Sequence, residues 1–432
     1  MRLVLLLLLP LAAAAAHAQP ALLPLPAEVD WQDGPPFVVT PRTPVVVPPD
    51  DAEARRVAEA FAALVGNAVE GRPAVVEAAP DSAAIHFRIA DGHGAEGYAL
   101  DVAADRVTLT ASAPAGLFYG AQTLRQLLPP RVEYEAAFDV PLAVPAVQIA
   151  DRPRFAWRGM MLDVARHFFE VEDVEQVIDL MALHKLNRLH LHLSDDQGWR
   201  FEVPGRPALT RVGGRTEVGG GEGGFYTADD YARIVRYAAE RFVTVVPEID
   251  LPGHTNAALA AIPELNCDGV ARPPYTGTRV GFSTVCVGKP ETWAFVEDVV
   301  AALAAQTPGP YIHLGGDEVE RLTEAEYAAF VERAQAVVAA HGKTFVGWDD
   351  VAEAALAPGA VVQVWRPQVP AVVARVAEAV AGGATVVLSP SDRIYLDMKY
   401  DADTILGLTW AGLNGVRAVS YTHLTLPTNR EV

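Results

Sequence analysis

From Phe155 onward the chain alternates short apolar segments with amphipathic ones, and this alternation restricts the possible folds more than any other feature. Strands are predicted at 157–163, 187–193, 243–249, 311–314, 344–348, 361–365 and 385–388. Amphipathic helical patterns lie between most of them, at 172–184, 228–242, 291–305, 324–341 and 370–381. Short apolar strands separated by helices predict a parallel sheet buried on both faces. The number of strands favours an α/β fold of the (β/α)8 TIM barrel type.

Before the barrel, residues 19–150 predict a small α/β accessory domain, and residues 151–419 form the predicted barrel domain. The accessory part mixes strands at 45–47, 84–89, 98–102 and 106–110 with helices at 51–65 and 114–128. It contains no cluster of chemically useful side chains. We therefore expect it to give structural support only.

The first residues predict export. Arg2 supplies a positive charge, Leu3–Leu9 an apolar run and Ala16-His17-Ala18 a cleavage site, so residues 1–18 are expected to be a signal peptide. The protein is then secreted or periplasmic. In such an oxidising compartment Cys267 and Cys286 are expected to form one disulfide across a long loop.

Charge excludes several partners. The chain has 34 basic and 54 acidic residues, a net charge of −20. Such a chain repels nucleic acid and anionic membranes, so we expect neither partner once the signal peptide is removed. The sequence leaves the oligomeric state open.

Nearly every predicted barrel strand ends in polar or aromatic residues. These are Arg158 and Asp163, Asp195 and Asp196, Glu248 and Asp250, Asp317 and Glu318, Trp348 and Asp349, Trp365 and Arg366, and Tyr395 and Asp397. The carboxyl ends of barrel strands carry the active site. The whole set therefore predicts a site, although a single polar strand end would not.

Asp317 and Glu318 form the sharpest local signal, because they follow a buried strand and the pair Gly315-Gly316. An exposed acidic turn is the alternative. Adjacent α-carbons lie about 3.8 Å apart, whereas ordinary glycosidases place two carboxyl groups roughly 5–9.5 Å apart on opposite sides of the sugar. The pair suits a reaction in which a 2-acetamido group of the substrate is the nucleophile.

Several ordered motifs carry a family resemblance that covers residues 20–419. The segments 154–168, 191–200, 246–255, 313–318, 347–349, 363–366 and 395–400 resemble family 20 glycoside hydrolases, the β-N-acetylhexosaminidases. The resemblance implies an exo-acting, retaining enzyme that needs no cofactor and no metal. Its partner would be an oligosaccharide ending in N-acetylglucosamine or N-acetylgalactosamine, hydrolysed through an oxazolinium intermediate formed by the substrate itself.

The resemblance also implies roles for single residues. Glu318 would be the general acid and then the general base, and Asp317 would hold the acetamide. Arg158 and Asp397 would bind sugar hydroxyls, and Tyr395 the acetamide oxygen. The remaining implied residues are the pocket walls Trp348, Trp365 and Trp410, and the polar pair Asp195 and His254 that tunes Glu318.

Two other functions remain open. His190 and His192 alternate with leucines in a strand, which would fit a metal-dependent TIM-barrel hydrolase, although we favour hydrogen-bonded core histidines. A non-catalytic N-acetylhexosamine-binding protein is the other alternative. Intact Asp317 and Glu318 argue against it.

The end of the chain departs from the family pattern. An eighth strand is missing from the prediction, and residues 420–432 resemble translated sequencing-adapter sequence. We therefore expect a C-terminally truncated catalytic domain and a non-native tail. An open barrel leaves strand edges unpaired, so the chain as written is expected to be weak, unstable or inactive.

Overall fold

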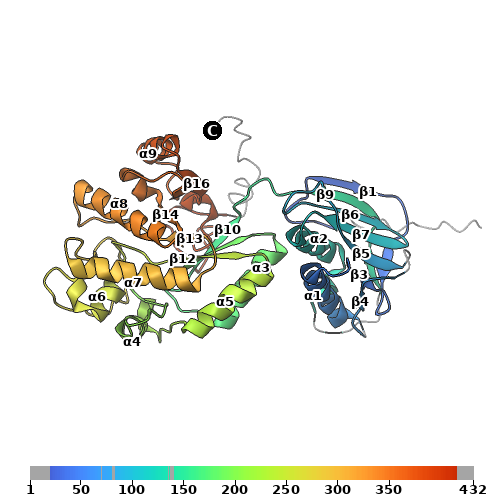
Figure 1. Ribbon diagram of the computed structural model, residues 1–432, viewed down its shortest axis with the longest axis horizontal. Helices are drawn as coiled ribbons and strands as arrows, with labels where there is room; N and C mark the ends of the chain where they lie inside the picture. Colours follow the sequence, from blue (N-terminus) through green and yellow to red (C-terminus); the bar gives the residue numbers. More distant parts are fainter. Residues whose placement is uncertain (1–19, 70, 80–82, 135, 137–140, 416–432) are drawn as a thin grey trace, which may run out of the picture. The chain divides into compact units, whose positions relative to one another are not determined.

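The computed structural model describes residues 20–69, 71–79, 83–134, 136 and 141–415, which form two compact units. The first contains the described residues up to Ala156 together with Leu183–Lys185, and the second contains the others (Figure 1). The predicted signal peptide, residues 1–18, and the predicted non-native tail, residues 420–432, lie outside the described residues. Among the helices described, none combines the length and the apolar character of a membrane span.

The first unit is a mixed sheet with two helices packed on it, which confirms the predicted α/β accessory domain. The larger sheet has the order β1-β9-β6-β7-β5-β3-β4, and β2 pairs with β8. The helices are α1 (Ala52–Ala68) and α2 (Pro114–Leu127). The strands are β1 (Glu28–Trp31), β2 (Phe37–Val39), β3 (Val45–Val46), β4 (Val75–Val76), β5 (Ala84–Ile89), β6 (Tyr98–Ala103), β7 (Arg106–Ala111), β8 (Leu142–Val144) and β9 (Val147–Asp151).

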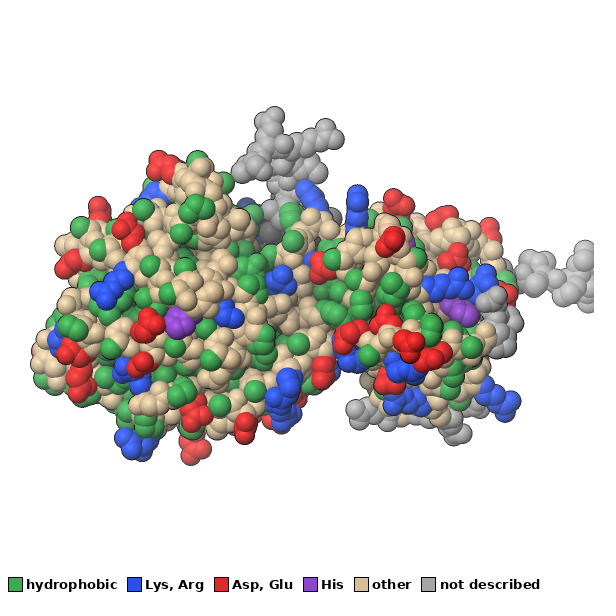
Figure 2. All heavy atoms as spheres, in the orientation of Figure 1, with side chains coloured by type: hydrophobic (Ala, Val, Ile, Leu, Met, Phe, Trp, Pro, Cys, Tyr) green, Lys and Arg blue, Asp and Glu red, His purple; other side chains and the backbone are tan. Residues whose placement is uncertain are grey.

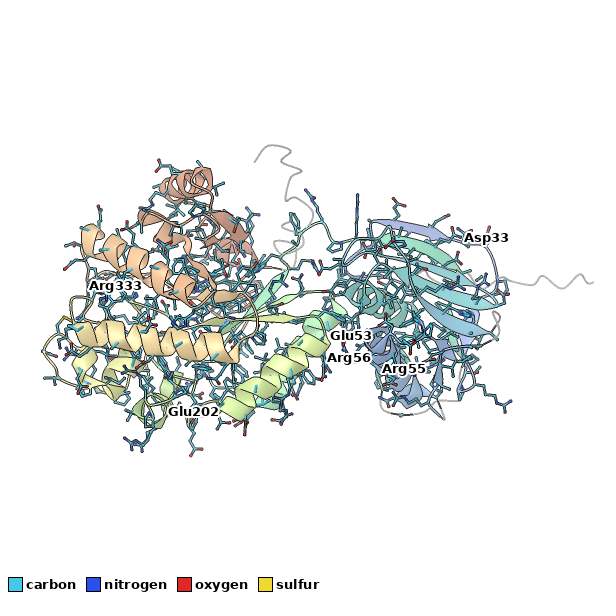
Figure 3. The ribbon with its side chains drawn as sticks, in the orientation of Figure 1. Asp33, Glu53, Arg55, Arg56, Glu202 and Arg333 are labelled. Carbon is cyan, nitrogen blue, oxygen red and sulfur yellow. A yellow bond between two sulfur atoms is a disulfide. The ribbon has the colours of Figure 1, made fainter. Side chains whose placement is uncertain are left out.

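Helix α1 shows why these segments fold as predicted. The Asp51 carboxylate accepts a hydrogen bond of 2.9 Å from the Ala54 N–H and so caps the helix. Its polar side carries Glu53, Arg55 and Arg56, which are labelled in Figure 3. Arg56 pairs with Glu53 at 2.7 Å, one helical turn away.

The second unit is a curled parallel sheet, and it contains all seven strands predicted from the alternation. Their order along the sheet is their order in the chain. This half-barrel confirms the predicted TIM-type fold. The strands are β10 (Gly159–Asp163), β11 (Arg188–His192), β12 (Thr244–Glu248), β13 (Tyr311–His313), β14 (Thr344–Trp348), β15 (Val361–Val364) and β16 (Thr385–Leu388).

Helices follow most of these strands, and Figure 1 shows the longer ones fanned around the sheet. Their starts are encoded locally, because Thr227 with Asp230 and Thr323 with Glu326 form capping boxes. The helices are α3 (Val171–Leu183), α4 (Ala208–Gly213), α5 (Ala228–Glu240), α6 (Asn256–Ala261), α7 (Pro290–Gln306), α8 (Glu324–Ala340), α9 (Pro370–Ala381) and α10 (Ser391–Ile394).

Packing between the outer helices also uses charged side chains. Arg333 of α8, labelled in Figure 3, lies 3.9 Å from the ring centroid of Trp293 on α7. On the face shown in Figure 2, described acidic and basic side chains are interspersed. The net charge of −20 is therefore not gathered into one patch on that face.

The register of the parallel strands brings their carboxyl ends together. Asp163 pairs with His192, His192 with Glu248, and Glu248 with His313. Polar side chains that follow these positions consequently converge at one edge of the sheet. The candidate site lies there.

Candidate active site

A glycine turn after β13 presents the two candidate catalytic carboxylates. Gly315 and Gly316 adopt φ angles of 63° and 99°, which favour glycine. A Cβ at Gly315 would lie 1.7 Å from Oδ1 of Asp250, so no larger residue fits. The Gly316 N–H donates to the same Asp250 oxygen at 3.0 Å. Asp250 therefore supports the turn that carries Asp317.

Glu318 itself has a φ angle of 53°, in the left-handed region that residues with a Cβ seldom occupy. Such backbone strain persists only where the surrounding structure imposes it, and it gathers at functional sites. The fold therefore holds Glu318 in an unfavourable conformation directly after Asp317.

His254 joins both carboxylates to a buried polar chain. Its Nε2 lies 3.7 Å from Asp317 Oδ2 and 3.3 Å from Glu318 Oε2. Its Nδ1 lies 3.2 Å from Asp195 Oδ1, and Arg166 Nη2 lies 2.8 Å from Asp195 Oδ2. The structure thus brings together four residues predicted for the site: Asp195, His254, Asp317 and Glu318.

Their charges reinforce one another. Burial alone would raise the pKa of Asp195, but the charges of Arg166 and His254 hold it well below its ordinary value. Burial would likewise lower the pKa of His254, yet Asp195, Asp317 and Asp250 raise it well above the ordinary value. His254 is therefore a cation beside the reacting carboxylates.

Asp317 differs from Asp195, because its pKa is raised. Burial is the largest cause and exceeds the opposing charge of His254, and the negative charges of Glu248 and Glu318 act in the same direction as burial. A carboxylate that is poorly solvated binds a polar N–H strongly, because it has few competing partners. Asp317 can therefore orient a substrate amide.

The predicted aromatic residues divide into two groups. Trp348, at the end of β14, is 5% exposed, and its Nε1 donates to Glu248 Oε1 at 2.9 Å. Trp365 and Tyr395 both pack edge-on against Trp410, with ring centroids 5.9 Å and 5.7 Å apart. These three rings form an aromatic cluster, of which Trp410 is 55% exposed.

Tyr395 of the cluster and the nearby Asp397 both experience charges of the site. The pKa of the Tyr395 hydroxyl is raised, first by burial and then by the charge of Asp317. Burial raises the pKa of Asp397, on which the charges of Arg166 and Asp163 act in opposite directions. Tyr395 therefore lies within electrostatic reach of Asp317, and Asp397 within that of Arg166.

Arg158 is the exception, and its predicted role needs correction. It precedes β10 and lies at the amino end of that strand, where its N–H donates to the Asn187 side chain at 3.0 Å. The carboxyl end of β10 lies roughly 16 Å away at the usual rise per residue. Arg166, three residues beyond the end of β10, lies at the site instead. Its position directly after a strand ending in Asp163 could have identified it.

The predicted strand histidines surround one carboxylate. His190 Nε2 and His192 Nδ1 each lie 2.6 Å from Glu248 Oε2, and His313 Nδ1 lies 3.2 Å from Oε1. His190, Glu248 and His313 could geometrically hold a cation. Each is nevertheless at most 5% exposed and bonded within the cluster. This arrangement fits hydrogen-bonded core histidines better than a substrate-accessible metal.

Another acidic pair follows β14 and was not assigned a role from sequence. Asp349 accepts hydrogen bonds from the Trp365 and Arg366 backbone N–H groups at 3.0 and 2.9 Å. Asp350 Oδ2 lies 2.7 Å from Arg366 Nη2 and 3.5 Å from Trp365 Nε1. Burial and the charges of Asp317 and Asp349 raise the pKa of Asp350 to about 7, against the effect of Arg366.

Cys267 and Cys286 form a disulfide, with α-carbons 5.0 Å apart. The loop between them lies beside the site, because Ser283 contacts Asp196 and the Gln197 side chain donates to the Gly277 carbonyl at 2.9 Å. The disulfide therefore closes a loop that supports the carboxyl end of β11.

Comparison with known proteins agrees with this geometry. The model of glycosyl hydrolase family 20, catalytic domain, matches residues 155–423, and that of glycosyl hydrolase family 20, domain 2, matches residues 19–152. A β-N-acetylhexosaminidase of Cellulomonas fimi is 45% identical over 396 residues, covering 91% of this chain and 78% of its own.

Solved structures give the same result. The N-acetyl-β-hexosaminidase of Streptomyces plicatus, in complex with thio-NAglucal, superimposes with a TM-score of 0.89 at 52% identity, covering 92% of this chain and 80% of that one. The family 20 β-N-acetylhexosaminidase of Streptomyces coelicolor A3(2) gives 0.90 at 51% identity, covering 93% and 82%. The chain therefore belongs to glycosyl hydrolase family 20, and the glycosidase class predicted from its motifs, β-N-acetylhexosaminidase, is confirmed.

Proposed function

We propose that this chain removes terminal β-linked N-acetylglucosamine or N-acetylgalactosamine from oligosaccharides, with retention of configuration and with the substrate acetamido group as nucleophile. One observation carries the mechanism. Asp317 and Glu318 leave one turn and approach the same nitrogen, His254 Nε2, at 3.7 and 3.3 Å. Two carboxylates on one side of a sugar cannot act as acid and nucleophile on opposite faces, and family 20 is a recognised exception to that arrangement.

The reaction follows from these positions. Glu318, whose side chain is 32% exposed, gives its proton to the glycosidic oxygen as the bond to the anomeric carbon breaks. The acetamido oxygen attacks that carbon, while Asp317 accepts the amide N–H and stabilises the cationic oxazolinium. Glu318, now a carboxylate, takes a proton from water as the water attacks the same carbon. Two inversions leave the configuration retained.

Binding of the sugar would use the other side chains of the site. The flat faces of Trp348, Trp365 and Trp410 suit the apolar faces of a pyranose and an N-acetyl methyl group. The Arg166 guanidinium, placed where Arg158 had been expected, and the Asp397 carboxylate suit sugar hydroxyls. A solved Streptomyces plicatus relative carries the product N-acetylglucosamine, which supports this substrate class.

We also propose that the protein works outside the cytoplasm, in the periplasm or after secretion. Two observations support export: the basic and apolar pattern of residues 1–18, and the disulfide between Cys267 and Cys286. Disulfides persist in oxidising compartments. Fractionation of cells that express the complete gene tests this, because a cytoplasmic pool of unprocessed protein contradicts it.

The enzymatic proposal is tested with the purified chain and p-nitrophenyl N-acetyl-β-glucosaminide. We expect release of p-nitrophenol that an N-acetylglucosamine thiazoline inhibits, at a rate lowered by the open sheet edge at β16. Glu318→Gln should lower kcat by about 10²–10⁴-fold, the usual contribution of a general acid, without changing the unfolding midpoint. Asp403→Asn, a change at an exposed residue, is the control. Tight binding of the thiazoline without any turnover would instead support the non-catalytic sugar-binding alternative, and activity that chelators abolish would support a metal-dependent hydrolase.

A further inference from the structure

Strands β11, β12, β13 and β14 enclose a carboxylate that the proposed mechanism does not use. Glu248 is fully buried and is contacted by four side chains. They are His190 (2.6 Å), His192 (2.6 Å), His313 (3.2 Å) and Trp348 (2.9 Å). Removing a carboxylate from water costs several kcal/mol unless every partner is well placed. An apolar side chain would fill a barrel interior without this cost.

Glu248 is connected to the reacting carboxylate by an unbroken series of contacts. His192 Nδ1 lies 2.6 Å from Glu248, and His192 Nε2 lies 3.0 Å from Asp195 Oδ2. Asp195 Oδ1 lies 3.2 Å from His254 Nδ1, and His254 Nε2 lies 3.3 Å from Glu318 Oε2. Carboxylates and imidazoles alternate, and both ring nitrogens of each imidazole lie within 3.3 Å of a carboxylate oxygen.

We propose that Glu248 is a positioning residue for the hydrolysis, acting through His192 and Asp195 on His254 and thereby on Glu318. The inference rests on the proposed function, because its effect on the reaction needs Glu318 to be the acid. Its first step, the control of histidine protonation by Glu248, is independent of turnover.

Electrostatics agrees with the geometry. Burial alone would lower the pKa of His192, but the Glu248 and Asp163 charges and its hydrogen bonds raise it well above the ordinary value. Burial lowers the pKa of His313 to about 4, so that ring is neutral at pH 7. A charged His192 donates from both nitrogens, to Glu248 and to Asp195. The hydrogen bond from His192 to Oδ2 of Asp195 then keeps Oδ1 of Asp195 directed toward His254.

Other groups also experience the Glu248 charge. It contributes to the raised pKa values of Asp250, Asp317 and Tyr395, for each of which burial is the largest cause. His190 faces the same carboxylate oxygen as His192. A change at Glu248 therefore needs a control that alters the cluster without touching the series that leads to Glu318.

Glu248→Gln removes the charge and keeps the shape. We expect the His192 ring, observed by ¹⁵N NMR at pH 7.5 and assigned with His192→Gln, to lose one proton. The His254 ring signal should also shift, because its partner Asp195 loses a cationic neighbour. In kinetics, the alkaline limb of kcat/KM should be displaced, because a neutral His192 no longer donates to both Glu248 and Asp195 and so no longer holds Asp195 and His254 in the arrangement that reaches Glu318.

His192→Gln should produce the same displacement of the limb, and the double variant should add nothing, because both changes break one series. His190→Gln is the matched control. It contacts the same Glu248 oxygen at the same distance, but its other nitrogen lies 3.4 Å from the Gln363 side chain. In His190→Gln, the His192 ring should keep both protons, and the alkaline limb of kcat/KM should not be displaced.

Three outcomes overturn the proposal: a His192 ring that keeps both protons in Glu248→Gln, an alkaline limb that does not move, or an equal displacement in His190→Gln. If Glu248→Gln does not fold, the comparison of His192→Gln with His190→Gln decides. If the unaltered chain neither releases p-nitrophenol nor binds the thiazoline, the proposed function fails independently of this series. The two histidine ring signals still decide whether Glu248 controls this series.

Discussion

Strands β11 and β16 belong to the same sheet but have opposite surroundings. β11 pairs with β10 and β12, and four of its five residues are buried. β16 pairs only with β15 among the described residues, and Val386 and Leu388 are 39% and 47% exposed. We call β11–β14 the closed side, and β16 with residues 395–413 the open edge.

The difference separates the two tasks of the site. The reacting carboxylates follow the closed side, where Asp195 and His254 are at most 2% exposed. The aromatic cluster of Trp365, Tyr395 and Trp410 belongs largely to the open edge. Catalytic geometry therefore rests on buried strands of the sheet, whereas one wall for the sugar rests largely on its exposed edge.

The largest difference is expected in stability. Leu191 of β11 is fully buried, and Leu191→Ala should lower the free energy of unfolding by about 2–5 kcal/mol. Leu388→Ala, the same change on β16, should cost less than about 1 kcal/mol because little transfer free energy is lost. Urea unfolding of the two variants measures both. Equal losses would mean that the open edge is covered in solution.

The alternation of apolar segments predicted all seven strands on both sides, because it depends only on local pattern. It could not predict the difference in burial, since that depends on which strands lie on either side. Arg158 shows a similar limit. Arg158 was assigned by its place in a motif, but it precedes β10. Arg166 follows the carboxyl end of β10 and therefore lies at the site.

Other parts of the site were predictable for clear reasons. Asp317 and Glu318 follow a glycine pair, and Gly315 lies so close to Asp250 that no side chain fits there. The glycine motif in the sequence therefore predicts the turn that presents the two carboxylates. Glu248 was noted only as a polar strand end. Its contacts come from three other strands, and no local spacing in the chain encodes them.

Asp350, which follows β14 and precedes β15, makes the stability of the fold dependent on pH. Its pKa is raised from 3.8 to about 7, so the folded state keeps a proton that the unfolded state has already lost in this range. The contribution of Asp350 to the free energy of unfolding is therefore largest below pH 4. It declines between pH 4 and pH 7, by at most about 1.4 kcal/mol per pH unit. Asp350→Asn should remove this decline.

Urea unfolding at pH 4, 5.5 and 7.5 tests the effect as the difference between the unaltered chain and Asp350→Asn. The variant should gain relative stability as pH rises. Asp403→Asn, at an exposed position of the open edge, controls for the loss of one negative charge. A constant difference across the three pH values would show that Asp350 ionises normally.

The smallest effect on stability is expected at Trp410, where a substitution should weaken substrate binding but leave the unfolding free energy almost unchanged. Trp410 is 55% exposed and packs edge-on against Trp365 and Tyr395, so Trp410→Ala should raise KM about tenfold through loss of a stacking surface. Its unfolding free energy should change by no more than about 0.5 kcal/mol, as for other surface positions. Leu406→Ala, at an 82% exposed apolar residue of the same segment outside the aromatic cluster, should change neither value. If Trp410→Ala lowers kcat instead of raising KM, the open edge takes part in positioning the reacting groups, and the division of tasks between the two sides fails.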